Sequence, residues 1–163
     1  MIVLGIDPGL AIVGFGVINY DGQRAAPVEY GAITTDKEES FPKRIREVYE
    51  GMQYLIGKFK PDAIAIEELF FSKNVKTALQ VAHARGVALL ACSQYTPALY
   101  EYTPLQIKQA VAGYGRADKQ QMQSMVKTLL NLREVPRPDD AADALAVAIC
   151  HAHSSNMRAY FKI

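Results

Sequence analysis

The chain contains 163 residues, of which 50% are hydrophobic and 21% are charged, and its formal net charge is +1 at pH 7. This length and composition are typical of one globular domain with its own core, and they exclude intrinsic disorder and fibrous repeats. The apolar runs fall well below the roughly 20 residues that cross a membrane, no signal peptide is expected at the N-terminus, and the two cysteines lack metal-binding spacing.

The first part of the chain is predicted to form three antiparallel strands. An apolar run at 2–6 leads into a Gly-Ile-Asp-Pro-Gly turn, which is typical of a strand that breaks into a loop. Residues 14–20 and 28–34 are predicted as the next two strands, and Asp21-Gly22 between them is a strong hairpin signal.

Helices and strands alternate in the rest of the chain. From Ser40, a candidate N-cap, apolar residues recur at helical spacing until Lys60, and a short buried strand is predicted at 63–66. The remaining elements are predicted as a helix, a strand and three helices, at residues 73–94, 97–102, 104–112, 118–131 and 139–153. This order indicates an α/β fold with a mixed sheet that is covered on both faces.

Acidic side chains stand where two of the predicted strands end. Asp7 follows the apolar run at 2–6, and Glu67 follows the one at 63–66. Because ligands of open α/β sheets gather at strand ends, both acids are candidates for one site. Each also has a simpler interpretation, since Asp7 before Pro8 can close a turn and Glu67 can be an ordinary acid of a surface loop.

A third acidic segment begins the last predicted helix. Asp140 and Asp143 share one helix face, which continues to the apolar Val147 and is therefore expected to point toward the sheet. Alternatively, these acids and Asp139 only complement the helix dipole and cap its first turn. Carboxylates that converge from all three segments would repel one another unless protonation or cations neutralise them. Such oxygen ligands favour Mg²⁺ or Mn²⁺ and are typical of two-metal phosphodiester hydrolysis.

The small net charge conceals an uneven distribution of charge along the chain. Residues 1–72 carry a net charge of −4, residues 73–133 of +6 and residues 134–163 of −1. The basic side chains of the middle segment include Lys73, Lys76, Lys108, Arg116 and Lys119. This segment either forms solvated helix faces or forms a surface that follows nucleic-acid phosphates.

Five motifs occur together in the chain: Gly5-Ile6-Asp7-Pro8-Gly9, Ala65-Ile66-Glu67, Lys73-Asn74, Ala84-Arg85-Gly86-Val87 and Asp140-Ala141-Ala142-Asp143-Ala144-Leu145-Ala146. In this order and spacing they resemble the RuvC family of Holliday-junction resolvases over essentially the whole chain. The first motif alone has low specificity because actin-like ATPases use a similar turn to bind phosphate. The set of motifs is highly specific.

The resemblance implies a single ribonuclease-H-like nuclease domain over residues 1–163. Its five-stranded mixed sheet would have three antiparallel strands first and helices on both faces. The family likeness also implies a homodimeric, Mg²⁺-dependent endonuclease in which Mn²⁺ substitutes. Such an enzyme resolves four-way DNA junctions by paired symmetric nicks during recombination and repair, leaving 5′-phosphate and 3′-hydroxyl ends. By the same resemblance the protein is expected in the cytoplasm, in contact with a branch-migration motor complex.

The resemblance also assigns roles to single residues. The family's acidic tetrad, which would hold two metal ions, corresponds to Asp7, Glu67, Asp140 and Asp143. The tetrad acids Glu67 and Asp140 have acidic neighbours, Glu68 and Asp139, and we prefer the former pair because it keeps the motif spacing. Lys119 matches a family lysine near the scissile phosphate and Lys108 matches a second one. Asp118 is expected to cap a helix rather than to bind metal.

Two further segments are candidates for contacts with DNA or with a second subunit. Phe70 aligns with a family aromatic that stacks at the junction centre, although a Phe pair such as Phe70-Phe71 is more often part of a core. Residues 78–91 are rich in small side chains, which suits either a dimer contact or an internal helix. Two rival functions fit parts of the sequence: an actin-like ATPase would use the Gly-Ile-Asp-Pro-Gly turn, and a junction-binding module without catalysis would need only the basic middle segment. The complete carboxylate set argues against the second.

Overall fold

The computed structural model describes residues 1–69, 75–96, 98–154 and 158–163. Its sheet contains five strands: β1 (Ile2–Asp7), β2 (Ile12–Tyr20), β3 (Ala25–Thr34), β4 (Ala63–Glu67) and β5 (Leu99–Tyr102). Its helices are α1 (Phe41–Phe59), α2 (Val75–Tyr95), α3 (Pro104–Ala112), α4 (Lys119–Leu129) and α5 (Asp139–His153), followed by a 3-10 turn at Arg158–Tyr160. Every predicted helix and strand is present, with ends that shift by a few residues.

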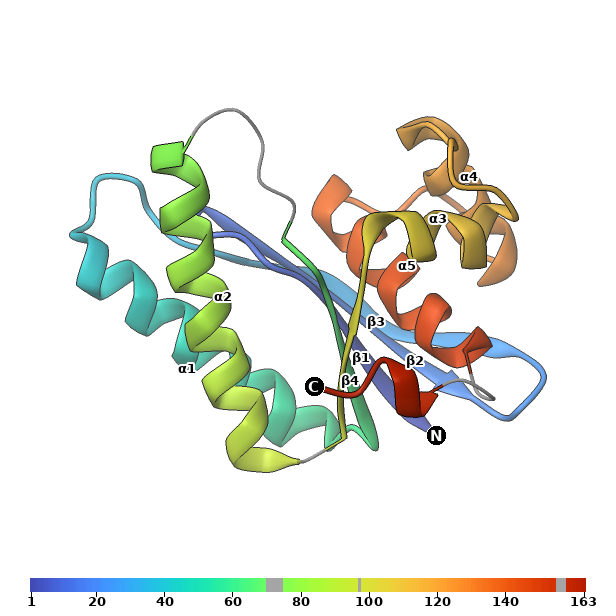
Figure 1. Ribbon diagram of the computed structural model, residues 1–163, viewed down its shortest axis with the longest axis horizontal. Coiled ribbons are helices and arrows are strands. Elements are labelled where there is room, and N and C mark those ends of the chain that lie inside the picture. The colour runs from blue at the N-terminus through green and yellow to red at the C-terminus, as the bar shows by residue number, and fades with distance from the viewer. Residues whose placement is uncertain (70–74, 97, 155–157) are drawn as a thin grey trace.

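The strands form one mixed sheet in the order β3-β2-β1-β4-β5. β1 pairs antiparallel with β2, and β2 pairs antiparallel with β3, whereas β4 runs parallel to both β1 and β5. Helices α1 and α2 cover one face of this sheet, and α5 covers the other face with α3 and α4 packed on it (Figure 1). The predicted architecture, including the three antiparallel strands at its start, is confirmed.

Strand alternation decides which side chains face α5. Leu4 and Ile6 of β1 belong to the core between the sheet and helices α1 and α2, whereas Val3 belongs to the core beneath α5. Because successive side chains of a strand point to opposite faces, Asp7 lies on the same face as Val3. The same period places Glu67 on the face of Ala65, which also packs beneath α5. Both terminal acids therefore face α5.

Glycines let α5 lie very close to the sheet. A Cβ atom at Gly14 would overlap the backbone carbonyl of Asp140, and one at Gly5 would overlap the carbonyl of Ala144. Gly14 is also the cross-strand partner of Asp7. The absence of a side chain at Gly14 therefore brings the first turn of α5 next to the end of β1.

Gly14→Ala is expected to lower the free energy of unfolding by about 3 kcal/mol, because the new Cβ meets helix backbone that cannot move aside. The matched control is Gly57→Ala in α1, where a Cβ meets no atom within 4 Å. Alanine has the better helix propensity, so the control should gain about 0.5–1 kcal/mol. Urea denaturation of both variants measures the difference, and equal stabilities would contradict the close-packing argument.

Three local details differ from the sequence-based expectations. β3 begins at Ala25 rather than at 28, because a register shift between Val17 and Ile18 lets the strand continue past Pro27. Ser40 holds the N-cap position of α1, but its side chain makes no capping hydrogen bond. The chain end also pairs with the sheet, where Lys162 bridges β5 in the antiparallel direction.

Candidate active site

Two carboxylates lie side by side at the carboxyl ends of the central parallel strands. The register pairs Ile6 of β1 with Ile66 of β4, so Asp7 and Glu67 are the next residues on adjacent strands. Apart from the partly buried Ile2, both strands consist of buried residues that are apolar or glycine up to these positions. The buried strands therefore hold the two acids at one edge of the sheet.

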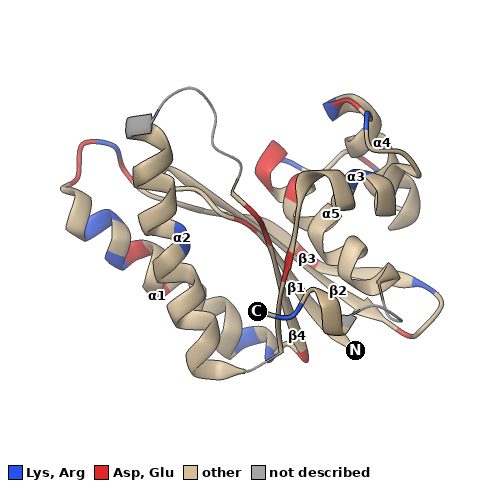
Figure 2. Cartoon of the chain, viewed as in Figure 1, with Lys and Arg blue, Asp and Glu red and all other residues tan. Residues whose placement is uncertain are grey.

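Helix α5 brings the third acidic segment to the same edge. Its N-cap is Pro138, and both Asp139 and Asp140 lie in its first turn. Asp143 follows one turn later, and the helix from Ala144 onward is almost entirely buried. Figure 2 shows acidic residues along the central strands and at the beginning of α5. Acids that are distant in the sequence thus meet at the junction of sheet and helix.

A cavity of about 260 Å³ opens at this junction. Its lining is Asp7, Glu67, Pro104, Ile107, Lys108, Lys119, Met122, Asp143 and Ala146. Three of the four predicted acids and both predicted lysines of the site therefore line one cavity. The fourth acid, Asp140, lines a neighbouring cavity instead, although its charge still acts on Asp7.

The acids perturb one another strongly. Burial, followed by the charges of Glu67, Asp143 and Asp140, raises the pKa of Asp7 to about 8. Burial and the charge of Asp143 raise the pKa of Glu67 to about 7, against an opposing effect of Lys108. Burial also raises the pKa of Asp143, which Lys119 partly offsets. Burial and like charges both disfavour the ionised form of these carboxylates. Nearby positive charge would therefore stabilise the site.

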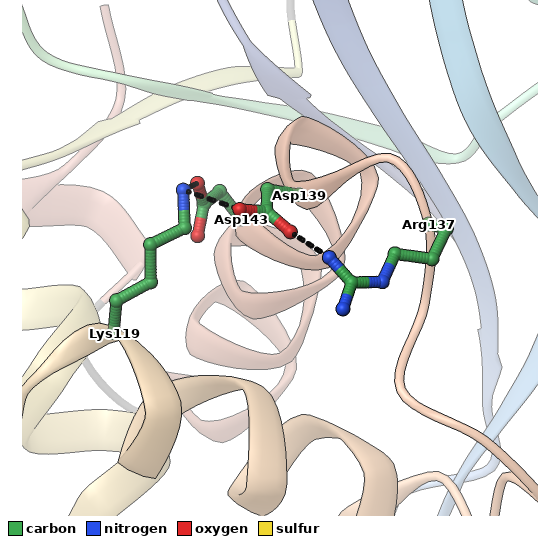
Figure 3. A network of polar contacts seen from close by, with 4 residues as sticks. All are labelled: Lys119, Arg137, Asp139 and Asp143. Carbon is green, nitrogen blue, oxygen red and sulfur yellow. Dashed lines mark hydrogen bonds and ion pairs between the residues drawn. The ribbon is translucent and has the colours of Figure 1, made fainter.

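Lys119 supplies part of that positive charge. Its Nζ lies 3.3 Å from Asp139 Oδ2 and 3.5 Å from Asp143 Oδ2 (Figure 3). Partial burial opposes the charged lysine, but the two carboxylates outweigh it and raise its pKa. Arg137 Nη1 donates a hydrogen bond of 2.8 Å to Asp139 Oδ1. Asp139 is therefore paired with two cations, which supports the preference for Asp140 as the tetrad acid.

Lys119 owes its position to a well-formed helix start. The side chain of Asp118 accepts a hydrogen bond from the backbone of Gln121, and the Gln121 side chain accepts one from the backbone of Asp118. This capping box holds the first turn of α4. The prediction that Asp118 caps a helix is confirmed.

The donor set fits a hard divalent cation, since it consists of carboxylate oxygens around one cavity, two of them in buried positions that disfavour a bare negative charge. Within the described residues, however, no three His, Cys, Asp or Glu side chains stand together as a complete cation site. The carboxylates converge on one cavity, but the described side chains do not have the arrangement of a complete metal-binding site.

Several predicted DNA contacts can be placed only in part. Lys108 lines the cavity, and Arg116 is exposed in the connection between α3 and α4. Phe70 and Lys73 lie outside the described residues, as does the side chain of Lys76 at the start of α2.

Comparison with known proteins identifies the family. Residues 3–151 match the family model of the crossover junction endodeoxyribonuclease RuvC. The chain belongs to the RuvC family. The RuvC protein of Alkaliphilus oremlandii is 60% identical over 163 residues, which cover 100% of this chain and 99% of that protein. The resemblance that the five motifs indicated is therefore confirmed, and with it the class of endonuclease that resolves crossover junctions.

Solved RuvC structures share the fold over nearly the full length. The Thermus thermophilus RuvC structure superposes with a TM-score of 0.89 at 36% identity, covering 99% of both chains. A second structure, T. thermophilus RuvC in complex with a Holliday junction substrate, has a TM-score of 0.87 at 34% identity over 96% of both chains. The ribonuclease-H-like fold is thus confirmed for this member of the RuvC family. None of the described helices is long and apolar enough to cross a membrane.

Proposed function

We propose that this RuvC-family protein cuts four-way DNA junctions by paired symmetric nicks, through two-metal-ion hydrolysis that leaves 5′-phosphate and 3′-hydroxyl ends. The observation that carries this proposal is the convergence of Asp7, Glu67 and Asp143 on one cavity, with Asp140 beside it. The relative whose structure contains a Holliday junction supports the choice of substrate. Recombination and DNA repair are the processes that such an activity serves.

The four acids would hold two Mg²⁺ ions, for which Mn²⁺ can substitute. Asp7 would be the central member of this set, because the charges of Glu67, Asp143 and Asp140 all raise its pKa. Bound Mg²⁺ supplies a nucleophilic hydroxide near neutral pH and stabilises charge on the leaving oxygen. The chain's own part is to orient the scissile phosphate and to keep this charged centre partly shielded from bulk water.

Lys119 would contact the scissile phosphate once cations occupy the carboxylates. Its ammonium group already lies in the cavity, 3.5 Å from Asp143. Lys119→Gln is expected to slow cleavage by roughly 100-fold, because it removes a charged donor from the developing negative charge. Lys127→Gln on the same helix is the control, since Lys127 is absent from the cavity lining. Single-turnover cleavage rates test this, and equal rates would contradict the role.

The remaining predicted DNA contacts are proposed to bind the arms and the centre of the junction. Lys108 lines the cavity, and Arg116 is exposed in the connection between α3 and α4. Lys73 and Lys76 would contact phosphates, and Phe70 would stack on an unpaired base at the junction centre, a contact that is typically worth about 1–3 kcal/mol.

A homodimer is proposed because paired cuts in a nearly two-fold symmetric junction need two active sites related by the same axis. The candidate segment 78–91 lies in α2, which buries Ala84, Ala88 and Ala91 beneath it. Its outer face exposes Leu79 and Leu90, by 54% and 53%. The inner face of α2 therefore fits the interpretation as an internal helix, and its outer face is available for the proposed dimer contact. Sedimentation is expected to give a dimer at micromolar concentration, and a monomer alone would contradict it.

The cellular location and the partner of the protein are also part of the proposal. We propose that the protein acts in the cytoplasm, with a branch-migration motor complex as a partner. The whole chain, residues 1–163, is proposed to act as a single nuclease domain.

A direct experiment is incubation with a synthetic mobile four-way junction, with and without Mg²⁺, resolved on a denaturing gel. The expected result is Mg²⁺-dependent pairs of nicks at symmetric positions in two opposed strands. Cleavage of an RNA–DNA hybrid instead of the junction would assign a different substrate. Binding of the junction without any cleavage in Mg²⁺ or Mn²⁺ would reduce the protein to a binding module.

A further inference from the structure

A second cavity, of about 310 Å³, lies next to the carboxylate site. It is formed by the β1–β2 turn, helix α1, the beginning of α2 and the beginning of α5, and its lining is Gly9, Leu10, Ala11, Ile12, Arg44, Thr77, Gln80, Val81 and Asp140. Asp140 belongs to this lining, whereas Asp7, Glu67 and Asp143 line the first cavity. The carboxylate set therefore borders both cavities.

Arg44 of α1 is the basic side chain of this second cavity. Its Nε donates a hydrogen bond of 2.9 Å to Thr35 Oγ1. Thr35 is only 9% exposed, and its hydroxyl donates to the Leu10 carbonyl at 2.7 Å. Its backbone amide donates to the Ala11 carbonyl at 3.0 Å. Arg44 is thus fastened, through a buried threonine, to the turn that follows Asp7.

The anchored geometry leaves the outer part of the guanidinium available. Over the described stretches of the chain, no carboxylate forms an ion pair with Arg44, and no hydrogen bond engages its two terminal amino groups. A guanidinium presents a planar fork of donors that matches phosphate oxygens. Fixing Nε in advance reduces the side-chain entropy that is lost when the fork binds.

We propose that the second cavity is a phosphate subsite, in which Arg44 binds a backbone phosphate of the cleaved strand next to the scissile one. The strand then runs from the first cavity past Asp140 into the second. Arg44 offsets the repulsion between that phosphate and Asp140. This inference rests on the proposed junction-cleaving function and adds a specific strand contact to it.

The test measures junction affinity against NaCl concentration in the cleavage-inactive Asp7→Asn background. Arg44→Gln is expected to weaken binding about tenfold and to lower the slope of log K against log salt by about 0.9, because one phosphate contact no longer releases a counterion. The control Arg46→Gln removes an exposed charge of the same helix that does not line the cavity. It should leave the slope unchanged. An unchanged slope in Arg44→Gln overturns the proposal.

Two further arms keep the result interpretable. Arg44→Lys retains the charge but loses the planar fork of donors and the hydrogen bond to Thr35. It should therefore weaken binding while keeping the slope of log K against log salt. A slope lowered as in Arg44→Gln overturns the proposal. Inorganic phosphate at matched ionic strength should not displace the junction, and displacement that depends on Arg44 would assign a free-anion site instead. Failure of the parent function is a separate result, namely wild-type protein that does not cut the junction in Mg²⁺.

Discussion

Asp7→Asn is expected to abolish junction cleavage and to leave junction binding largely intact. Asp7 faces the cavity from the end of a buried strand, and its pKa is raised by all three other acids of the tetrad. Removing its charge would remove one of the carboxylates that would hold the metal ions. Metal stabilisation of the transition state contributes several kcal/mol, so cleavage should fall by about a thousandfold or more. Single-turnover cleavage and a gel-shift titration measure the two quantities on the same preparation.

Asp36→Asn is a matched control for Asp7→Asn, because Asp36 is exposed in the connection between β3 and α1. It should leave cleavage unchanged. The Asp7→Asn protein should also be more stable than wild type at pH 8 without metal, since a buried carboxylate with a raised pKa destabilises the fold when ionised. Full nicking activity in the Asp7→Asn variant would remove the proposed mechanism.

The apparent affinity for Mg²⁺ is expected to rise steeply between pH 6 and pH 8. Metal binding requires ionised carboxylates, and burial among like charges raises the pKa of Asp7 to about 8 and that of Glu67 to about 7. At pH 6 both groups are mostly protonated. The affinity should therefore fall by more than roughly a hundredfold from pH 8 to pH 6. Calorimetric titration of the DNA-free protein with MgCl₂ measures this, and a pH-independent affinity would contradict it.

The same pKa shifts predict how stability changes with pH in the absence of metal. Both folded-state pKa values lie above the ordinary values of 3.8 and 4.5, so the folded protein holds protons that the unfolded chain has lost. The free energy of unfolding should therefore decrease as pH rises from about 4 to about 8. Mg²⁺ should restore stability at pH 8 and have little effect at pH 5. Asp7→Asn should flatten much of the decrease.

The order of helices and strands, and the candidacy of these acids for one site, could be predicted from the sequence because both depend on local patterns. Apolar runs that end on Asp7 and Glu67 are visible along the chain, and the Asp-Ala-Ala-Asp spacing places Asp140 and Asp143 on one helix face. The charge block similarly indicated that Lys108 and Lys119 belong to a basic segment. Local periodicity contains this information because side-chain direction follows backbone geometry residue by residue.

The distances between these segments were decided by the tertiary structure alone. Gly14 admits α5 close to the sheet, and only that packing brings Asp140 and Asp143 to the ends of β1 and β4. The pairing of Asp139 with Lys119 depends on the approach of α4 to α5, which no local pattern encodes. No pattern in the sequence singled out Arg44, because its anchor through Thr35 joins α1 to a turn that is distant in the sequence. Local sequence determines which groups a segment presents, whereas their mutual distances, and hence their pKa values and cavities, arise when separate segments pack together.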